Sequence, residues 1–412
     1  MDEEHKSLSF FHGFLPDEDA NRLLQQDGDF LLQSRNTSGP KRTKLILAVR
    51  SSTIRRFEFH RTENGDFRLL VSSTSNRTND LQGQTFPTVK AAIDHFQTFD
   101  SNTKKLRLKR PIPKTKYQLA HKDIRLIRKI GSGSYGTVYK GLLVRKPVAV
   151  KRIDSYGKTG QKLKEMMKEA RVMQIYDHKN IVKFYGFVVD RPPLSSGHGV
   201  VYIEDKLRST GRLIDVPFRV DWSAQAACGL EYLHKKLSIH RDVSARNCLL
   251  SGSILKLADF GMCRETEIYK VDLSKPLNHR KFGKRGETKF NTDVYAFGIL
   301  LWELFIRPYR CPYGFWSASK VRKLTLDGYR MPTPDGMPDQ MAVVMKRCWD
   351  HQPAKRPTAS ELRRELHSIN RMIGNTPSDI ITSFERSSLS TSPNTAKPKS
   401  LSEVVETAIS PK

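Results

Sequence analysis

The segment "IHRDVSARNCLL" (Ile239–Leu250) decides how the second half of this chain is interpreted. It contains the run His240, Arg241, Asp242, and it places Asn247 five residues after the aspartate. A short run of this kind becomes specific only when other motifs accompany it in a fixed order. The interpretation therefore depends on the patterns that flank the segment.

Three further patterns lie upstream and downstream of it. Residues 130–138 read "IGSGSYGTV", a glycine-rich loop whose backbone can approach the phosphates of a nucleotide. Glycine-rich hairpins are common, so this loop alone is weak support. The next pattern, "PVAVK", ends at Lys151, which has a candidate ion-pair partner in Glu169 on a predicted helix. Downstream, "LADFG" supplies Asp259, followed by Phe260.

These four elements resemble, in their order and spacing, the signature of the protein kinase family. A chance coincidence of all four is negligible. The resemblance covers nearly all of residues 123–372 and implies a bilobal kinase fold, with a β-rich N-lobe and a helical C-lobe. It also implies an ATP-dependent phosphotransferase that uses Mg²⁺ (or Mn²⁺).

The resemblance assigns a role to each residue of the core set. Asp242 is expected to accept the proton of the substrate hydroxyl, and Asn247 and Asp259 are expected to bind the metal ion. Lys151, paired with Glu169, is expected to contact the α- and β-phosphates of ATP. The nucleotide-binding residues implied by the resemblance are Ile130, Gly131, Ser132, Gly133, Ser134, Tyr135, Gly136, Thr137, Val138 and Lys151.

The catalytic loop also indicates which hydroxyl is phosphorylated. Serine/threonine kinases have a lysine two residues after the catalytic aspartate, where this chain has Ser244; tyrosine kinases have an arginine four residues after it, where this chain has Arg246. The segment "CWDHQPAKRPT" (Cys348–Thr358) resembles the tyrosine kinase C-lobe signature. We therefore expect a protein tyrosine kinase with Arg246 among its catalytic residues and Tyr269 as its activation-loop phosphorylation site. In "TDVYAFGILLWELF", Asp293 is expected to brace the catalytic loop.

Departures from the kinase pattern leave a second interpretation open. Asp205 lies where the family has an apolar or small residue at the back of the nucleotide pocket, and burying it unpaired would be costly. The family's Ala-Pro-Glu motif is replaced by "HRKFGKR" (residues 279–285), so that Arg356 lacks its expected glutamate partner. The alternative is a catalytically impaired pseudokinase scaffold that acts through protein–protein interactions. The intact core set favours the enzyme.

The first half of the chain, residues 10–100, has the pattern of a small α+β binding module, a sheet flanked by two helices. Helical spacing in "DEDANRLLQQ" and "FPTVKAAIDHFQTF" flanks segments of strand character such as "GDFLLQS" and "KLILAVR". Together with "FFHGFLPDEDANRLL", this order resembles a Src homology 2 domain, which binds phosphotyrosine. Such a domain directly before a tyrosine kinase domain is similar to the Fes/Fer-type non-receptor tyrosine kinases.

One position departs from the Src homology 2 pattern. The family's phosphate-binding arginine lies in a "FLVRES" strand, whereas this chain reads "FLLQSR", with Gln33 at that position. Glutamine carries no charge, and charge-assisted hydrogen bonds are the stronger ones. Arg35 and Arg56 are the candidate replacements in phosphotyrosine binding. The alternatives are a module with weakened phosphotyrosine binding and a module that only packs against the kinase domain.

Composition bounds the remaining questions. The net charge is +28, from 71 basic and 43 acidic residues, but no nucleic-acid motif accompanies it, so we expect no nucleic-acid partner. The basic linker, residues 101–122, is a candidate for peripheral contact with the inner face of the plasma membrane. Residues 373–412 are rich in Ser and Thr and are predicted to be disordered. Five widely spaced cysteines and an N-terminus without a signal-peptide pattern predict a cytoplasmic protein. The resemblance to the Fes/Fer-type kinases implies a role in intracellular signalling.

Overall fold

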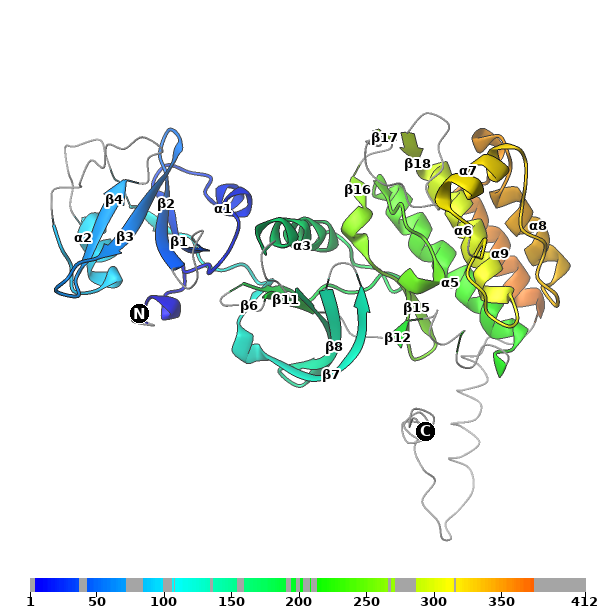
Figure 1. Cartoon of the computed structure of the whole chain (residues 1–412), viewed down its shortest axis with the longest axis horizontal. Coiled ribbons are helices and arrows are strands. Elements are labelled where there is room, and N and C mark those ends of the chain that lie inside the picture. Colours follow the sequence, from blue (N-terminus) through cyan, green and yellow to red (C-terminus); the bar gives the residue numbers. More distant parts are fainter. Residues whose placement is uncertain are drawn as a thin grey trace, which may run out of the picture.

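A computed structural model gives the fold of the chain (Figure 1). It starts with a small sheet and two helices, continues through a second sheet with one long helix, and ends in a mostly helical lobe. The described residues are 4–36, 43–71, 84–98, 106, 108–133, 136–153, 159–189, 194–197, 201–202, 208, 213–265, 268–270, 287–314 and 316–373.

The first unit is a five-stranded sheet in the order β4-β3-β2-β1-β5, where β1 to β4 are antiparallel and β5 joins β1 in parallel. Alternate side chains of β3, Phe57 and Phe59, are buried in one cluster with Val89 and Ile93 of α2. The predicted order of helix, strands and helix is present. The elements are α1 (Asp17–Leu23), β1 (Asp29–Asn36), β2 (Thr43–Arg50), β3 (Ile54–Arg61), β4 (Phe67–Val71), α2 (Val89–Thr98) and β5 (Arg110–Pro111).

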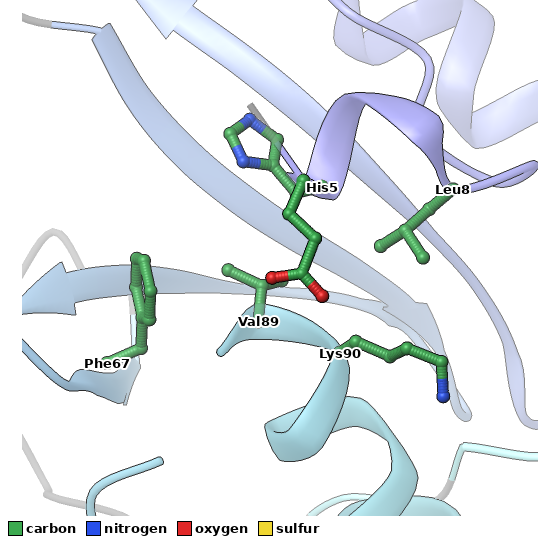
Figure 2. A pocket seen from close by; sticks show the side chains of 6 residues that line it. His5, Leu8, Phe67, Val89 and Lys90 are labelled. Atoms are coloured by element: carbon green, nitrogen blue, oxygen red, sulfur yellow. The ribbon is translucent and has the colours of Figure 1, made fainter. Parts of the chain in front are cut away.

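A single 3₁₀ turn, η1 (Glu4–Ser7), precedes this unit and lies against its α2 side. Leu8, which follows the turn, lines a small pocket together with Phe67 of β4 and with Val89 and Lys90 of α2 (Figure 2). The shallow pocket between these side chains is therefore part of the packing of η1 on the sheet.

The second unit is a six-stranded sheet in the order β6-β10-β11-β9-β8-β7, accompanied by the helix α3. Leu163, Met166, Met167 and Ala170 follow one another at helical spacing on α3, and all four are buried. The elements are β6 (Gln118–Leu119), η2 (His121–Asp123), β7 (Ile124–Gly133), β8 (Gly136–Leu143), β9 (Lys146–Ile153), α3 (Thr159–Met173), β10 (Phe187–Val188) and β11 (Leu194–Gly197).

The third unit is built around α6, whose residues 292–305 are all buried. Gly298 allows close packing against the end of α8, because a Cβ atom there would lie 2.6 Å from the indole nitrogen of Trp349. Among the described residues, no helix combines the length and the apolar character needed to cross a membrane. The helices are α5 (Val216–Lys235), α6 (Phe290–Phe305), α7 (Ala318–Leu326), α8 (Asp339–Cys348) and α9 (Ala359–Ile373).

Short strands and 3₁₀ turns lie between the second unit and α6. The strands form one three-stranded sheet, β12-β14-β15, and two strand pairs, β13-β16 and β17-β18. A β-rich lobe followed by a helical lobe is the bilobal α+β fold that the sequence predicts, and the prediction is confirmed. These elements are β12 (Val201–Tyr202), β13 (Ser238–Ile239), η4 (Ala245–Asn247), β14 (Cys248–Ser251), β15 (Ile254–Leu257), η5 (Phe260–Met262), β16 (Arg264–Glu265), β17 (Ile268–Lys270), β18 (Glu287–Lys289) and, before α9, η6 (Pro353–Lys355).

The first unit contacts the second through α1 and the segment before it. The Phe14 amide donates to the Val189 carbonyl at 2.7 Å, and the guanidinium of Arg171 on α3 forms an ion pair with Asp19 of α1. Within the linker, residues 110–119 supply β5 to one sheet and β6 to the other. Figure 1 shows α1 beside α3 accordingly. The predicted tail beyond Ile373 lies outside the described residues.

Candidate active site

Lys151 lies in the sheet of the second unit, where β9 pairs it with Val138 of β8. Its Nζ atom is 2.8 Å from the Glu169 carboxylate on α3 and 4.0 Å from the Asp259 carboxylate. Glu169 is buried, so the lysine head group is held between two acidic side chains at the inner side of the sheet. The structure therefore brings together the predicted ion pair and one of the two predicted metal ligands.

The glycine-rich loop is the turn between β7 and β8. Gly133 lies opposite Gly136, and Gly131 lies opposite Val138, so the two strands remain paired up to the turn. Thr137 and Val138 are half-buried. Ser134 and Tyr135 fall outside the described residues, as do the side chains of residues 130–133 and 136.

The catalytic-loop backbone is held by a carboxylate from α6. Asp293 is fully buried and accepts hydrogen bonds from the backbone amides of His240 and Arg241, both at 2.7 Å. The His240 ring lies 3.1 Å from the Ala258 carbonyl oxygen. Arg241 has a φ of 70°, an uncommon conformation for this residue type that the two hydrogen bonds help to maintain. The prediction that Asp293 braces the loop is confirmed.

Asp242 follows directly and is 7% exposed. The Nη2 atom of Arg246 lies 2.8 Å from both of its carboxylate oxygens. Burial alone would lower the pKa of Arg246, but the Asp242 carboxylate outweighs this effect and the pKa is raised. Arg246 therefore remains charged, and it fixes the orientation of the predicted catalytic carboxylate.

Asn247 and Asp259 are the two predicted metal ligands. The Asn247 side chain donates from Nδ2 to the Asp242 carbonyl at 2.8 Å, so its amide oxygen is oriented as an acceptor. The Asp259 side chain is 36% exposed, and partial burial, with the nearby Glu169 and Asp242 charges, raises its pKa although Lys151 acts against this. A carboxylate and an amide oxygen are suitable ligands for Mg²⁺ or Mn²⁺. A bound cation would also offset the repulsion between Asp259 and the neighbouring carboxylates.

Phe260 fixes the position of Asp259. The phenyl ring is buried, with ring centroids 5.1 Å from His240 and 5.2 Å from Tyr176. Asp259 itself has a φ of 63°, in the left-handed region that aspartate adopts more readily than most residues. The packed ring therefore holds the preceding carboxylate beside Lys151.

α6 carries a second buried carboxylate, which none of the sequence motifs indicated. Glu303 accepts a hydrogen bond from the Ala245 amide at 3.0 Å and another from the Tyr309 hydroxyl at 3.2 Å. It thereby supports η4, the turn that carries Arg246 and Asn247. One charged residue in the apolar run Val294–Phe305 is the signal that could have identified it.

The expected departures from the kinase pattern lie largely outside the described residues, which include neither Asp205 nor residues 279–285. Arg356 is described, and it donates to the carbonyls of Asn291 and Asp350, both at 3.0 Å, with its guanidinium over the Tyr295 ring. Tyr269 lies in β17, with its backbone paired to Thr288 of β18.

The two candidate phosphotyrosine-binding arginines lie close together in the first unit. Arg35 forms an ion pair with Asp17, and Arg56 lies 3.4 Å from the same carboxylate. Gln33 is fully buried and donates from Nε2 to the Leu15 carbonyl at 2.7 Å. Arg35 and Arg56 therefore meet at one place, but they meet around an acidic side chain of the chain itself.

The protein tyrosine and serine/threonine kinase family matches residues 124–366, which include the catalytic loop and its supports. The tyrosine-protein kinase Fer of Mus musculus is 34% identical over 385 residues, which are 88% of this chain and 44% of that protein. The tyrosine-protein kinase transforming protein Fps of avian sarcoma virus is 31% identical over 88% of this chain and 68% of that protein. Fer-related kinase 1 of Caenorhabditis elegans is 30% identical over 88% of this chain and 94% of that protein.

This chain thus spans less than half of the length of Fer, but nearly all of the Caenorhabditis elegans relative. The matched family residues carry the Lys151–Glu169 pair and the supported catalytic loop described above. The chain belongs to the protein tyrosine and serine/threonine kinase family and, within it, to the Fer/Fps tyrosine kinases.

Proposed function

We propose that the chain is a non-receptor protein tyrosine kinase, which transfers the γ-phosphoryl group of ATP to tyrosine side chains of proteins. One observation carries the proposal: the Lys151 Nζ atom lies 2.8 Å from the Glu169 carboxylate and 4.0 Å from the Asp259 carboxylate. The lysine proposed to bind phosphate and a carboxylate proposed to bind the metal ion therefore lie side by side. Phosphoryl transfer depends mainly on positioning and on neutralisation of charge, which such an arrangement supplies.

The proposed mechanism assigns each step to residues of the chain. Lys151, oriented by Glu169, holds the α- and β-phosphates, and the glycine-rich turn covers them. Asn247 and Asp259 would hold Mg²⁺ or Mn²⁺, which when bound neutralises charge on the phosphoryl oxygens. Asp242, oriented by Arg246, hydrogen-bonds the tyrosine hydroxyl and takes its proton as the tyrosine oxygen bonds to the γ-phosphorus. The bond from that phosphorus to the β,γ-bridging oxygen breaks in the same step, and ADP leaves.

The scaffold alternative finds no support in the comparisons, because the relatives are named as tyrosine kinases. The geometry also favours the enzyme, since the residues of the core set are arranged around one site and several have supporting hydrogen bonds. We extend the proposal to Tyr269 as an autophosphorylation site on the activation segment. Its backbone pairing with β18, which leads into α6, would link the phosphorylated residue to the helix that holds the catalytic loop.

The partners belong to the same proposal. Protein substrates carry the accepting tyrosine, and the first unit acts as a Src homology 2 domain whose phosphotyrosine affinity is weakened at Gln33. The proposed location is the cytoplasm, with peripheral contact between the basic linker and acidic lipid. Of the linker's described cations, Lys109 and Arg110 pair with Asp27 and Asp29, so part of its charge is used within the first unit.

The test is autophosphorylation of the purified chain with Mg²⁺ and ATP, read by mass spectrometry. The wild type should acquire phosphate on Tyr269, and the Asp242→Asn variant should acquire none while still binding ATP. Asp327→Asn, an exposed residue after α7, is the matched control and should behave as the wild type. Phosphorylation that persists in Asp242→Asn would contradict the mechanism. Absence of phosphate in folded wild-type protein that binds ATP would instead favour the scaffold.

A further inference from the structure

One face of the small sheet gathers basic side chains beside the start of α1. Residues directly opposite each other in paired strands point to the same face. Gln33 and Arg35 of β1 therefore share a face with Lys44 of β2 and Arg56 of β3, because Arg35 pairs with Lys44 and Ala48 pairs with Arg56. An anionic side chain that reached this face would meet three cations.

Each of these cations already has an acidic partner in the chain. The Arg35 guanidinium contacts one oxygen of the Asp17 carboxylate, and the Arg56 Nε atom lies 3.4 Å from the other. Lys44 pairs with Glu58 at 2.8 Å. Two guanidinium groups from different strands thus converge on one carboxylate, as they would on an incoming anion.

Burial distinguishes the roles of the three side chains. The Arg56 side chain is 17% exposed, Arg35 is 36% exposed and Asp17 is 47% exposed. Burial lowers the pKa of Arg56, and the Asp17 charge acts in the opposite direction. Arg56, which also donates a hydrogen bond to the side-chain oxygen of Asn21, therefore lies at the base of the site. The Asp17 carboxylate is at the solvent side, where a competing anion has access.

Neighbouring contacts keep Asp17 in place. It is the first residue of α1, and the other acidic residues of that turn, Glu18 and Asp19, form ion pairs with Arg171 of α3. Beneath the site, Gln33 bonds to the Leu15 carbonyl and contributes no charge. The carboxylate is thus held at the anion position from one side by the helix and from the other by the two arginines.

We propose that Asp17 is an internal counter-ion that occupies the anion site between Arg35 and Arg56, so that a phosphotyrosine side chain binds only by displacing it. This rests on the proposed phosphotyrosine-binding function of the first unit and identifies the residue that sets its affinity. A phosphate carries more charge than a carboxylate and three acceptor oxygens, but it must first overcome repulsion from Asp17.

A different role for Asp17 leads to a different result. Acidic residues are commonly found in the first turn of a helix, where they stabilise the positive end of the helix dipole. If that were its only role, removing the charge would lower stability slightly and leave phosphotyrosine binding unchanged. The internal counter-ion instead requires that removing the charge strengthens binding.

The experiment measures binding of a fluorescent phosphotyrosine peptide to the full chain by anisotropy, without ATP. Asp17→Asn should bind at least about tenfold more tightly than the wild type, since a repulsive charge is removed from contact distance. The matched control is Asp94→Asn on α2, which loses the same charge from an exposed ion pair with Lys90 and should bind as the wild type. Adding Arg56→Ala to Asp17→Asn should abolish the gain.

Equal affinity of the wild type and Asp17→Asn would overturn the proposal, and so would an equal gain with an unphosphorylated or a phosphoserine peptide. Asp17→Ser, which removes the same charge and keeps a polar side chain, gives a second measurement if the asparagine variant is unstable. Autophosphorylation is measured on the same samples. A chain that binds the peptide as expected but does not autophosphorylate would contradict the kinase proposal and leave the counter-ion proposal standing. A chain that autophosphorylates but binds the peptide equally well with and without the Asp17 charge would contradict the counter-ion proposal alone.

Discussion

Asp293 and Glu303, two residues of α6, are fully buried beneath the catalytic loop and accept hydrogen bonds from its backbone. A buried carboxylate is costly unless donors surround it, and backbone amides that leave regular secondary structure need acceptors. The carboxylates and the loop amides therefore satisfy each other's hydrogen-bonding requirements. The loop conformation that presents Asp242 is consequently set by α6, which does not itself contact the substrate in the proposed mechanism.

Replacing Asp293 by Asn tests this residue-scale dependence. The amide can accept at one oxygen only, so one loop amide would lose its partner, at a cost of about 1–3 kcal/mol. We expect the phosphorylation rate to fall by about tenfold or more, with ATP binding retained. Steady-state kinetics and nucleotide titration of the purified variant measure both quantities, with Asp339→Asn, an exposed residue of α8, as control. An unchanged rate would show that the loop holds its shape without this carboxylate.

The contact between α1 and α3 is the element-scale feature that joins the two halves. Arg171 lies two residues after Glu169 on α3, so the helix that orients Lys151 also carries the ion pairs to α1. Leu15, Ala20 and Leu24 of the first unit belong to the same buried cluster as the apolar face of α3. Displacing α1 would therefore disturb the helix that holds the lysine's partner.

Arg171→Ala should weaken this contact measurably. Asp19 is 8% exposed and would lose its ion-pair partner, so we expect a loss of about 1–3 kcal/mol in the free energy of unfolding and a reduced phosphorylation rate. Arg22→Ala is the matched control. Arg22 forms an ion pair with Glu18 in the same turn of α1, but its side chain is 64% exposed, and exposed ion pairs contribute about 0.2–1 kcal/mol. Urea denaturation and kinase assays compare the two; equal effects would mean that α1 does not depend on Arg171.

His12 lies where the sheet of the first unit, the linker and the sheet of the second unit meet. Its Nδ1 atom is 2.9 Å from the Gln118 side-chain oxygen, and its Nε2 atom is 2.9 Å from the Ile112 carbonyl. Gln118 in turn donates to the His12 carbonyl at 2.9 Å. At the scale of the whole molecule, one buried imidazole therefore ties together three segments of the chain.

Burial lowers the pKa of His12 below its ordinary value of 6.5, against the raising effect of its hydrogen bonds. The folded state thus holds the neutral ring, and the unfolded chain takes up the proton first as the pH falls. His12 therefore contributes stability above pH 6.5 that is lost below it. Between pH 7.5 and 5.5 the free energy of unfolding should fall more in the wild type than in His12→Gln, as denaturant unfolding at the two pH values measures. A smaller loss in the wild type would indicate that the ring is bound as the imidazolium.

Residues in the kinase motifs could be found from the sequence, because the spacing within a short segment largely fixes their relation. Asp242, Arg246 and Asn247 lie within one turn-containing loop, and the Lys151–Glu169 pair joins neighbouring elements. The helices and strands of the first half followed for the same reason, from apolar periodicities that extend over a few residues. The chemistry that this local order encodes is the part of the protein that the sequence by itself determined.

The tertiary structure decided what lies next to these motifs. Glu303 reaches Ala245 from 58 residues away, and His12 reaches Ile112 from 100 residues away. Arg35 and Arg56 were identified as candidates, but Asp17 became their partner only because α1 packs over the sheet face that carries both. Such contacts arise from the packing of whole elements, which no single segment encodes, and a charge acts on whichever groups that packing brings within a few ångströms.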